Sequence, residues 1–143
     1  MVGKQEAPQA KPSILVCEAY EGLQEVFRLM LDDWASVQVV SKTSEWLPVL
    51  AKHHWDFFVL DLDGQSGEPL ELVRNIRLAY PDLKLLLVAG QFDYEFQVAC
   101  VKLGQLSFLT KPFSAPAAVA KIKTLLGLAA SSIHTRIVKI ALS

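Results

Sequence analysis

The amino-acid sequence predicts an α/β protein, a doubly wound sheet of five parallel strands that alternate with five helices. Short runs of apolar, often β-branched residues alternate along the chain with segments whose apolar residues recur at helical spacing. The chain has 143 residues, of which 52% are hydrophobic and 20% are charged. This length and composition are typical of one folded domain with its own apolar core.

The first half of the chain contains three predicted strands and two predicted helices. The strands are SILVC at 13–17, VQVVS at 37–41 and DFFVLD at 56–61. The first helix has one apolar face at i, i+3, i+4, i+7 spacing, made of Leu23, Val26, Phe27, Met30, Leu31 and Trp34. Thr43 or Ser44 can cap the second helix, in which Pro48 is then expected in the first turn. The apolar residues of that helix are Trp46, Leu47, Val49 and Leu50.

The second half contains three predicted helices and two predicted strands. A helix over 69–79 is stopped by Pro81, and the strand LKLLLVAG follows at 83–90. Gly104 ends the next helix, whose apolar residues are Phe96, Ala99, Cys100 and Leu103. After the strand LSFLT at 106–110, Ser114 and Pro116 open a last helix that reaches about Leu126.

Functional groups of a doubly wound sheet collect at the carboxyl ends of its strands. The residues at those ends are Glu18 and Ala19 after the first strand, Asp61 and Asp63 after the third, Ala89 and Gly90 after the fourth, and Thr110, Lys111 and Pro112 after the fifth. Three carboxylates are therefore expected to face one lysine.

Four segments at these strand ends resemble the response regulator receiver domain, the phosphoacceptor module of two-component signalling. They are ILVCEAY, DFFVLDLDGQSGEPLELVRNIR, LLLVAG and FLTKPF. The resemblance extends over about residues 13–127 and implies the flavodoxin-like receiver fold. It also implies a signalling role rather than an enzyme, with a histidine kinase or a phosphotransfer protein as the partner.

The resemblance gives each of these polar residues a role. Asp61 is the expected phosphoacceptor. Lys111 is the expected cation that neutralises the transition state, and in the family a cis peptide before the proline, here Pro112, holds that lysine in place. Mg²⁺, which neutralises the same charge, is expected on Glu18, Asp61 and Asp63.

Two positions depart from the family pattern. Ala19 replaces the second member of the acidic pair, which usually touches Mg²⁺, so we expect weak metal binding that Glu18 and Asp63 compensate in part. Ala89 replaces the hydroxyl residue that contacts the phosphoryl group and draws an aromatic residue, here Phe108, inward. We therefore expect weak coupling between phosphorylation and conformation.

A binding module that works without phosphorylation is the first alternative. Its docking face would combine the helix around 96–103, the strand at 106–110 and the last helix, and a homodimer could form through the same face. Basic residues lie there or nearby: Lys102, Lys121 and Lys123. No nucleic-acid partner is expected, because the segment after residue 127 is too short for a helix-turn-helix output domain.

A haloacid-dehalogenase-type phosphatase is the second alternative, because VLDLDG also resembles the first motif of those enzymes. There the first aspartate, here Asp61, is the nucleophile, and the second, here Asp63, is the general acid. Such enzymes need a further acidic pair on a later strand. No Asp or Glu follows Glu95 in this chain, so the phosphatase is the weaker hypothesis.

The remaining features indicate location and boundaries. A net charge of −1 favours no particular class of partner. No segment approaches the ~20 apolar residues that cross a membrane, so a cytoplasmic protein without membrane contact is expected. We expect a flexible segment at 1–12, the receiver domain at 13–127 and a tail or helix extension at 128–143. In the tail, three isoleucines at helical spacing could equally pack or fray: Ile133, Ile137 and Ile140.

Neither the cysteines nor the histidines suggest a metal site. Cys17 and Cys100 are isolated and are expected to be buried thiols. The histidines, His53, His54 and His134, are expected to be surface or packing residues.

Overall fold

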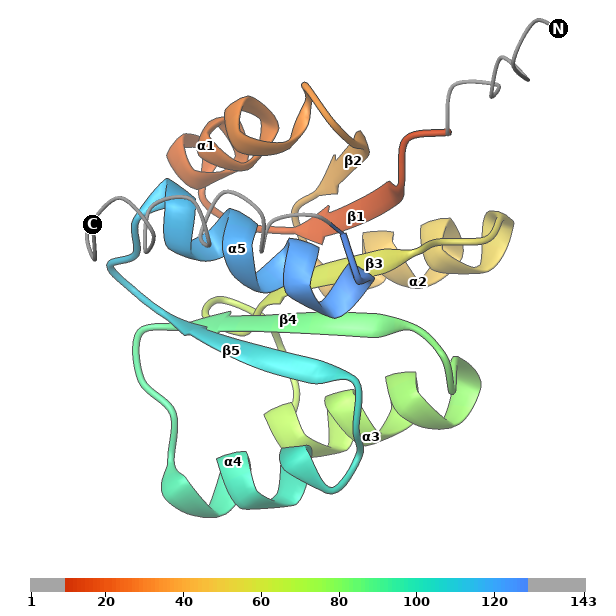
Figure 1. Ribbon diagram of the computed structural model, residues 1–143. Coiled ribbons are helices and arrows are strands. Elements are labelled where there is room, and N and C mark those ends of the chain that lie inside the picture. The colour runs from red at the N-terminus through yellow and green to blue at the C-terminus, as the bar shows by residue number, and fades with distance from the viewer. Residues whose placement is uncertain (1–9, 129–143) are drawn as a thin grey trace, which may run out of the picture.

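The computed structural model describes residues 10–128, and in that range five strands and five helices alternate strictly (Figure 1). The strands are β1 (Ser13–Cys17), β2 (Ser36–Val40), β3 (Phe57–Asp61), β4 (Lys84–Ala89) and β5 (Leu106–Thr110). The helices are α1 (Glu21–Leu31), α2 (Thr43–Lys52), α3 (Pro69–Ala79), α4 (Tyr94–Val101) and α5 (Ala115–Leu126). This succession confirms the predicted fold class.

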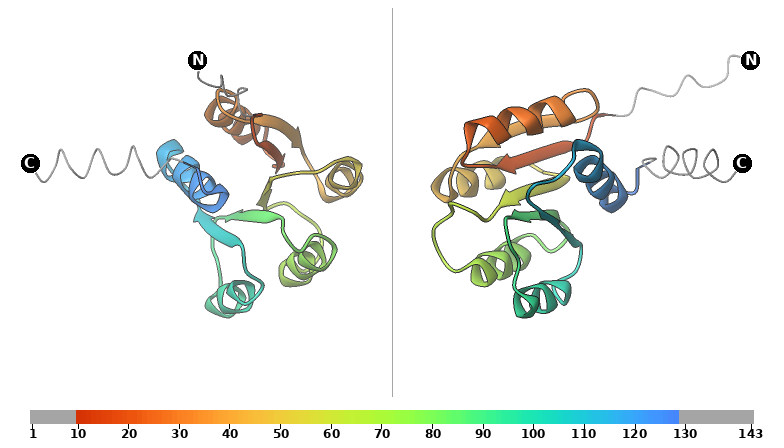
Figure 2. Two further views of the ribbon diagram at one scale, coloured as in Figure 1. Left: turned by 45° about the vertical axis from the view of Figure 1, so that its right-hand side comes forward. Right: turned by 90° about the vertical axis from the view of Figure 1, so that its left-hand side faces the viewer.

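The five strands form one parallel sheet in the order β2-β1-β3-β4-β5. Helices α1 and α5 cover one face, and α2, α3 and α4 cover the other, as the end-on view in Figure 2 shows. Because all strands run the same way, their carboxyl ends meet along one edge of the sheet.

The core is divided by the sheet into two apolar clusters. Phe58 and Leu60 belong to the cluster under α2, α3 and α4, whereas Phe57 and Val59 belong to the cluster under α1 and α5. Every residue of β3 is fully buried, including its last residue, Asp61. Successive side chains of a strand point to opposite faces of the sheet. Because both faces are covered by helices here, β3 needs apolar residues at nearly every position.

The ends of α3 and α5 are capped by their own side chains. The Glu68 carboxylate accepts a hydrogen bond from the Glu71 N–H at 2.8 Å, with Pro69 as the first helical residue. The Ser114 hydroxyl accepts one from the Ala117 N–H at 3.2 Å, as predicted. Gly127 closes α5 with a φ of 71°, a left-handed conformation that glycine adopts without steric cost.

Several predicted boundaries were wrong. Helix α2 has Lys42 rather than Thr43 or Ser44 at its N-cap, and Pro48 is its sixth residue rather than part of its first turn. Its apolar residues explain why the helix persists there, because the side chains of Trp46 and Leu50 are 2% exposed and supply packing that outweighs a lost backbone hydrogen bond.

The other boundaries differ by a few residues. Helix α1 ends at Leu31 and leaves Trp34 outside it, β3 begins at Phe57 rather than Asp56, and β4 spans Lys84–Ala89 rather than 83–90. Helix α4 ends at Val101, and Gly104 lies in the turn beyond it with a φ of 74°. Strand β2 begins at Ser36, one residue earlier than predicted, because its register is set by pairing with β1 from Ser13 onward. The differences leave the sheet order unchanged.

The isolated cysteines and histidines lie as expected where the structure describes them. Cys17 and Cys100 are fully buried, and burial raises the pKa of the first thiol to about 12 and of the second to about 11. His53 packs on Trp55 with ring centroids 4.4 Å apart, and the His54 side chain is 88% exposed. His134 and the isoleucines of the tail lie outside the described residues. None of the helices in residues 10–128 is long and apolar enough to span a bilayer.

Candidate phosphoacceptor site

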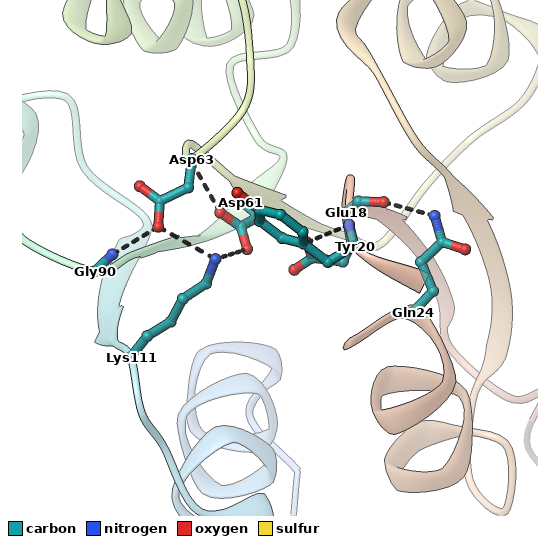
Figure 3. Close-up of polar contacts among 7 residues, drawn as sticks. All are labelled: Glu18, Tyr20, Gln24, Asp61, Asp63, Gly90 and Lys111. Carbon is teal, nitrogen blue, oxygen red and sulfur yellow. Dashed lines mark hydrogen bonds and ion pairs between the residues drawn. The ribbon is translucent and has the colours of Figure 1, made fainter. Parts of the chain in front are cut away.

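The carboxyl edge of the sheet brings four of the predicted site residues together. Asp61 is the last residue of β3, Glu18 follows β1, and Lys111 follows β5. Asp63 lies two residues beyond β3, at the start of the loop to α3. Figure 3 shows these side chains pointing toward one another from three different strand ends.

Asp61 and Lys111 form the central ion pair of the site. The Lys111 Nζ lies 2.5 Å from Asp61 Oδ2, and the side chains are 0% and 18% exposed. The backbone N–H of Asp63 donates to the other oxygen, Asp61 Oδ1, at 2.9 Å. Burial lowers the pKa of Lys111, but the hydrogen bond to Asp61 and its charge outweigh burial and raise the pKa overall. Lys111 is therefore a permanent cation beside Asp61.

The peptide bond between Lys111 and Pro112 is cis, as the resemblance to receiver domains implied. The same segment pairs with β4, because the Lys111 N–H donates to the Ala89 carbonyl at 2.9 Å. The end of β5 is thus fixed to its neighbouring strand immediately before the lysine side chain enters the site.

The Asp63 carboxylate faces the lysine rather than the other two carboxylates. Its Oδ2 accepts hydrogen bonds from the Gly90 N–H at 2.9 Å and from Lys111 Nζ at 3.2 Å (Figure 3). In residues 10–128 no three Asp, Glu, His or Cys side chains are grouped so that they could hold a metal ion. The role of Asp63 as a metal ligand therefore remains a prediction, and its observed partners are two hydrogen-bond donors.

Glu18 is a buried carboxyl group next to Asp61. It is 0% exposed, and its Oε2 accepts a hydrogen bond from the Tyr20 N–H at 3.1 Å. Burial raises the pKa of Glu18 from 4.5 to about 8, and a side-chain hydrogen bond with Asp61 adds to that increase. Glu18 therefore holds its proton more tightly than an ordinary glutamate, which reduces the negative charge that it places beside Asp61.

Two donors of this site were not found from the sequence. The Gly90 N–H contacts Asp63, and the Tyr20 N–H contacts Glu18; the Tyr20 ring also lies 5.2 Å from Lys111 Nζ. A backbone N–H is present at every residue except proline, so only the position of Gly90 at a strand end could have indicated its role. Nothing in the spacing of Tyr20 distinguishes it from an ordinary exposed aromatic residue.

Ala89 and Phe108, the predicted switch residues, lie on adjacent strands. Ala89 is 3% exposed at the end of β4. Phe108 packs edge-on against Phe92, with ring centroids 5.2 Å apart, and against Phe96 at 6.4 Å. A cavity of about 560 Å³ lies against Ala89 and is lined also by Phe92, Phe96 and Asp63 among other residues. Phe108 is therefore already held by two aromatic neighbours.

The fold and the buried Asp61–Lys111 pair define a receiver-type α/β signalling module, with the strand order of flavodoxin-like proteins. Residues 14–123 match the family model of the response regulator receiver domain. The chain belongs to that family, which confirms the resemblance seen in its sequence motifs.

Individual relatives agree with this family assignment. The chain is 30% identical to the regulatory protein VirG of Agrobacterium tumefaciens over 91 residues, which are 63% of this chain and 34% of VirG. It is 28% identical to the response regulator MprA of Mycobacterium sp. (strain KMS) over 114 residues, 79% of this chain and 50% of MprA. The matched part spans 22% to 50% of the length of such curated relatives.

Solved structures show the same fold. The non-phosphorylated HemR receiver domain of Leptospira biflexa is 28% identical, with a TM-score of 0.75 over 82% of this chain and 96% of that domain. A CheY-like receiver domain protein of Methanospirillum hungatei also has a TM-score of 0.75, at 19% identity, over 82% of this chain and 95% of that one.

The raised pKa of Glu18 predicts that the metal-free protein loses stability as the pH rises. The folded pKa, about 8, exceeds the ordinary value of 4.5, so the stabilisation is complete below about pH 4.5 and is lost as the pH passes through about 8. At about 1.4 kcal/mol per pKa unit, the difference between 4.5 and about 8 corresponds to a loss on the order of 5 kcal/mol. Glu18→Gln keeps a neutral donor toward Asp61 and should show a flatter dependence.

Urea unfolding with a chelator present, at several values between pH 5 and pH 9, measures this difference. Glu25→Gln is the matched control, because it makes the same substitution at a glutamate of α1 whose side chain is 63% exposed. Parallel curves for the parent and Glu18→Gln over the whole pH range would show that Glu18 is not the group responsible.

Proposed function

We propose that this chain is a response regulator receiver domain that accepts a phosphoryl group on Asp61 from a histidine kinase or a phosphotransfer protein. The observation that carries this proposal is the fully buried Asp61 carboxylate in an ion pair with Lys111. An Asp61 oxygen forms the new P–O bond while the P–N bond of the donor phosphohistidine breaks, and the imidazole leaves with its electron pair. Lys111 neutralises charge that would otherwise oppose the approach of two anions.

Receiver domains bind Mg²⁺ at their acidic pocket, and we infer weak binding in this one. When bound, Mg²⁺ neutralises charge between the attacking carboxylate and the phosphoryl oxygens. Glu18 and Asp61 are the side chains best placed to hold it, and the buried Glu18 Oε1 accepts no hydrogen bond within the described chain. Ala19 offers no ligand, and Asp63 contacts Lys111 and Gly90 instead.

We infer that the conformational response to phosphorylation is small. Ala89 has no hydroxyl to contact a phosphoryl group, so one differential interaction between two states is missing. Phe108 already packs against Phe92 and Phe96, which leaves less apolar area to gain from an inward movement.

A protein-binding role that does not depend on phosphorylation is the second candidate, and the surface of α4 favours it. Tyr94, Val98 and Val101 are 79%, 38% and 64% exposed and follow one another at i, i+4, i+7 spacing. This apolar stripe belongs to the α4-β5-α5 face, where a homodimer or another partner could dock. The cytoplasmic location and the domain limits at residues 13 and 127 stay predictions.

The haloacid-dehalogenase alternative is not proposed, because residues 14–123 match the receiver family as one continuous domain. The curated relatives VirG and MprA extend well beyond the matched part.

Phosphorylation itself is tested by incubating the chain with a small phosphodonor and Mg²⁺ and then measuring its intact mass. We expect a gain of one phosphoryl group in the parent and none in Asp61→Asn, which preserves shape and removes the nucleophile. An unmodified parent, alongside a receiver domain that is labelled under the same conditions, would leave only the binding-module candidate.

Restoring the missing acidic residue should strengthen metal binding. Ala19→Asp adds a carboxylate beside Glu18, and we expect the Mg²⁺ affinity to rise by about tenfold or more. Calorimetric titration of Mg²⁺ into both proteins measures it. Ala19→Asn is the control for side-chain size, and equal affinities in the parent and Ala19→Asp would remove the argument that Ala19 weakens the site.

Restoring the hydroxyl should strengthen the switch. With beryllofluoride as the phosphoryl mimic, amide chemical shifts of residues 92–113 should change little in the parent and more in Ala89→Thr. Ala89→Val, which adds the same volume without a donor, is the control. Large shifts at Phe108 in the parent would instead describe an ordinary switching receiver.

A further inference from the structure

We propose that the Asp63 carboxylate is an internal competitor of the phosphoryl group, occupying the two donors that an anion on Asp61 would need. This inference rests on the proposed function, because it concerns the same site. It assigns Asp63 a role in controlling phosphorylation that differs from metal ligation.

The first observation is that two donors converge on a single oxygen. Asp63 Oδ2 accepts from the Gly90 N–H at 2.9 Å and from Lys111 Nζ at 3.2 Å. These donors come from the ends of β4 and β5, two different strands. A carboxylate oxygen with a backbone N–H and an ammonium group as partners has the environment that an oxyanion prefers.

The second observation is that Asp61 and Asp63 share one cation. Lys111 Nζ lies 2.5 Å from Asp61 Oδ2 and 3.2 Å from Asp63 Oδ2. A phosphoryl group bonded to Asp61 would place its charged oxygens next to the same Nζ, where the Asp63 carboxylate already lies. Since like charges this close repel, the phosphoryl group must either displace Asp63 or lose part of its contact with Lys111.

The third observation is that the Asp63 side chain is partly exposed, while its backbone is anchored separately. Its side chain is 40% exposed, whereas Asp61 beside it is 0% exposed. Its backbone is held separately, because the Asp63 N–H donates to Asp61 Oδ1 at 2.9 Å. Rotation of the side chain into solvent would therefore free Gly90 and Lys111 while the loop keeps its place. The arrangement slows entry of an anion but does not block it.

The rate of labelling by a small phosphodonor tests this competition. Asp63→Asn removes the charge with the same shape, and Asp63→Ala removes the acceptor as well. We expect the rate in both variants to exceed the parent rate by about tenfold, the effect of one lost charge-assisted contact. Glu95→Gln is the control, because Glu95 lines the same cavity but belongs to the first turn of α4.

A binding measurement without phosphoryl transfer separates this inference from the proposed function. Inorganic phosphate is titrated while the Gly90 amide resonance is followed by NMR. The amide should respond in Asp63→Ala at phosphate concentrations about tenfold lower than in the parent. If the parent and both variants all remain unlabelled by the phosphodonor but differ in this way, the proposed function fails and the competition stands.

Three results would overturn the inference. Equal labelling rates and equal phosphate responses in the parent and the Asp63 variants would show no competition. A similar rate increase in Glu95→Gln would reduce the effect to general charge repulsion. Slower labelling together with weaker Mg²⁺ binding in Asp63→Asn would show instead that Asp63 is the metal ligand expected from the sequence.

Discussion

The buried Asp61–Lys111 ion pair is the constraint on which the rest of this site depends. A carboxylate at the end of the central strand has no exposure to water, and burying an unpaired charge would cost several kcal/mol, roughly the cost of breaking a buried pair. Lys111 can reach Asp61 only because β3 and β5 are parallel and end at the same edge of the sheet. This contact depends on the order of the strands, in which β4 lies between β3 and β5, and on the hydrogen bond that fixes the end of β5 to β4.

Three acidic side chains lie close together at this site, and two of them, Asp61 and Asp63, share one lysine. Glu18 is fully buried beside Asp61, and burial raises its pKa to about 8, which weakens the repulsion between the two carboxyl groups. Asp63 remains partly exposed and takes a share of Lys111 together with the Gly90 N–H. Without metal or phosphate, the charged groups of the site are therefore already paired with one another. A bound ligand must replace these contacts. The same contacts explain both the weak metal binding and the slow phosphorylation proposed above.

The fold class was predictable because strands and helices differ in the period of their apolar residues, and the alternation of five strands with five helices predicts a parallel sheet covered on both faces. The N-cap of α2 was not predictable, because the packing of Trp46 and Leu50 determines where that helix lies. Local residue preferences do not contain this information. The residues of the site were predictable from strand ends, since parallel strands bring their carboxyl ends together. The orientation of the Asp63 side chain could not be predicted, because it depends on the backbone N–H of Gly90 and on the conformation of the loop after β3.

The most direct test of this account is scalar coupling across the hydrogen bond between the Gly90 amide nitrogen and the Asp63 side-chain carboxyl carbon. NMR experiments that transfer magnetisation through hydrogen bonds detect such a contact in solution without any ligand. The account predicts a coupling in the parent that disappears when beryllofluoride and Mg²⁺ are added, because the Asp63 carboxylate then leaves the two donors. No coupling in the ligand-free protein, or a coupling that persists with beryllofluoride bound, would contradict it.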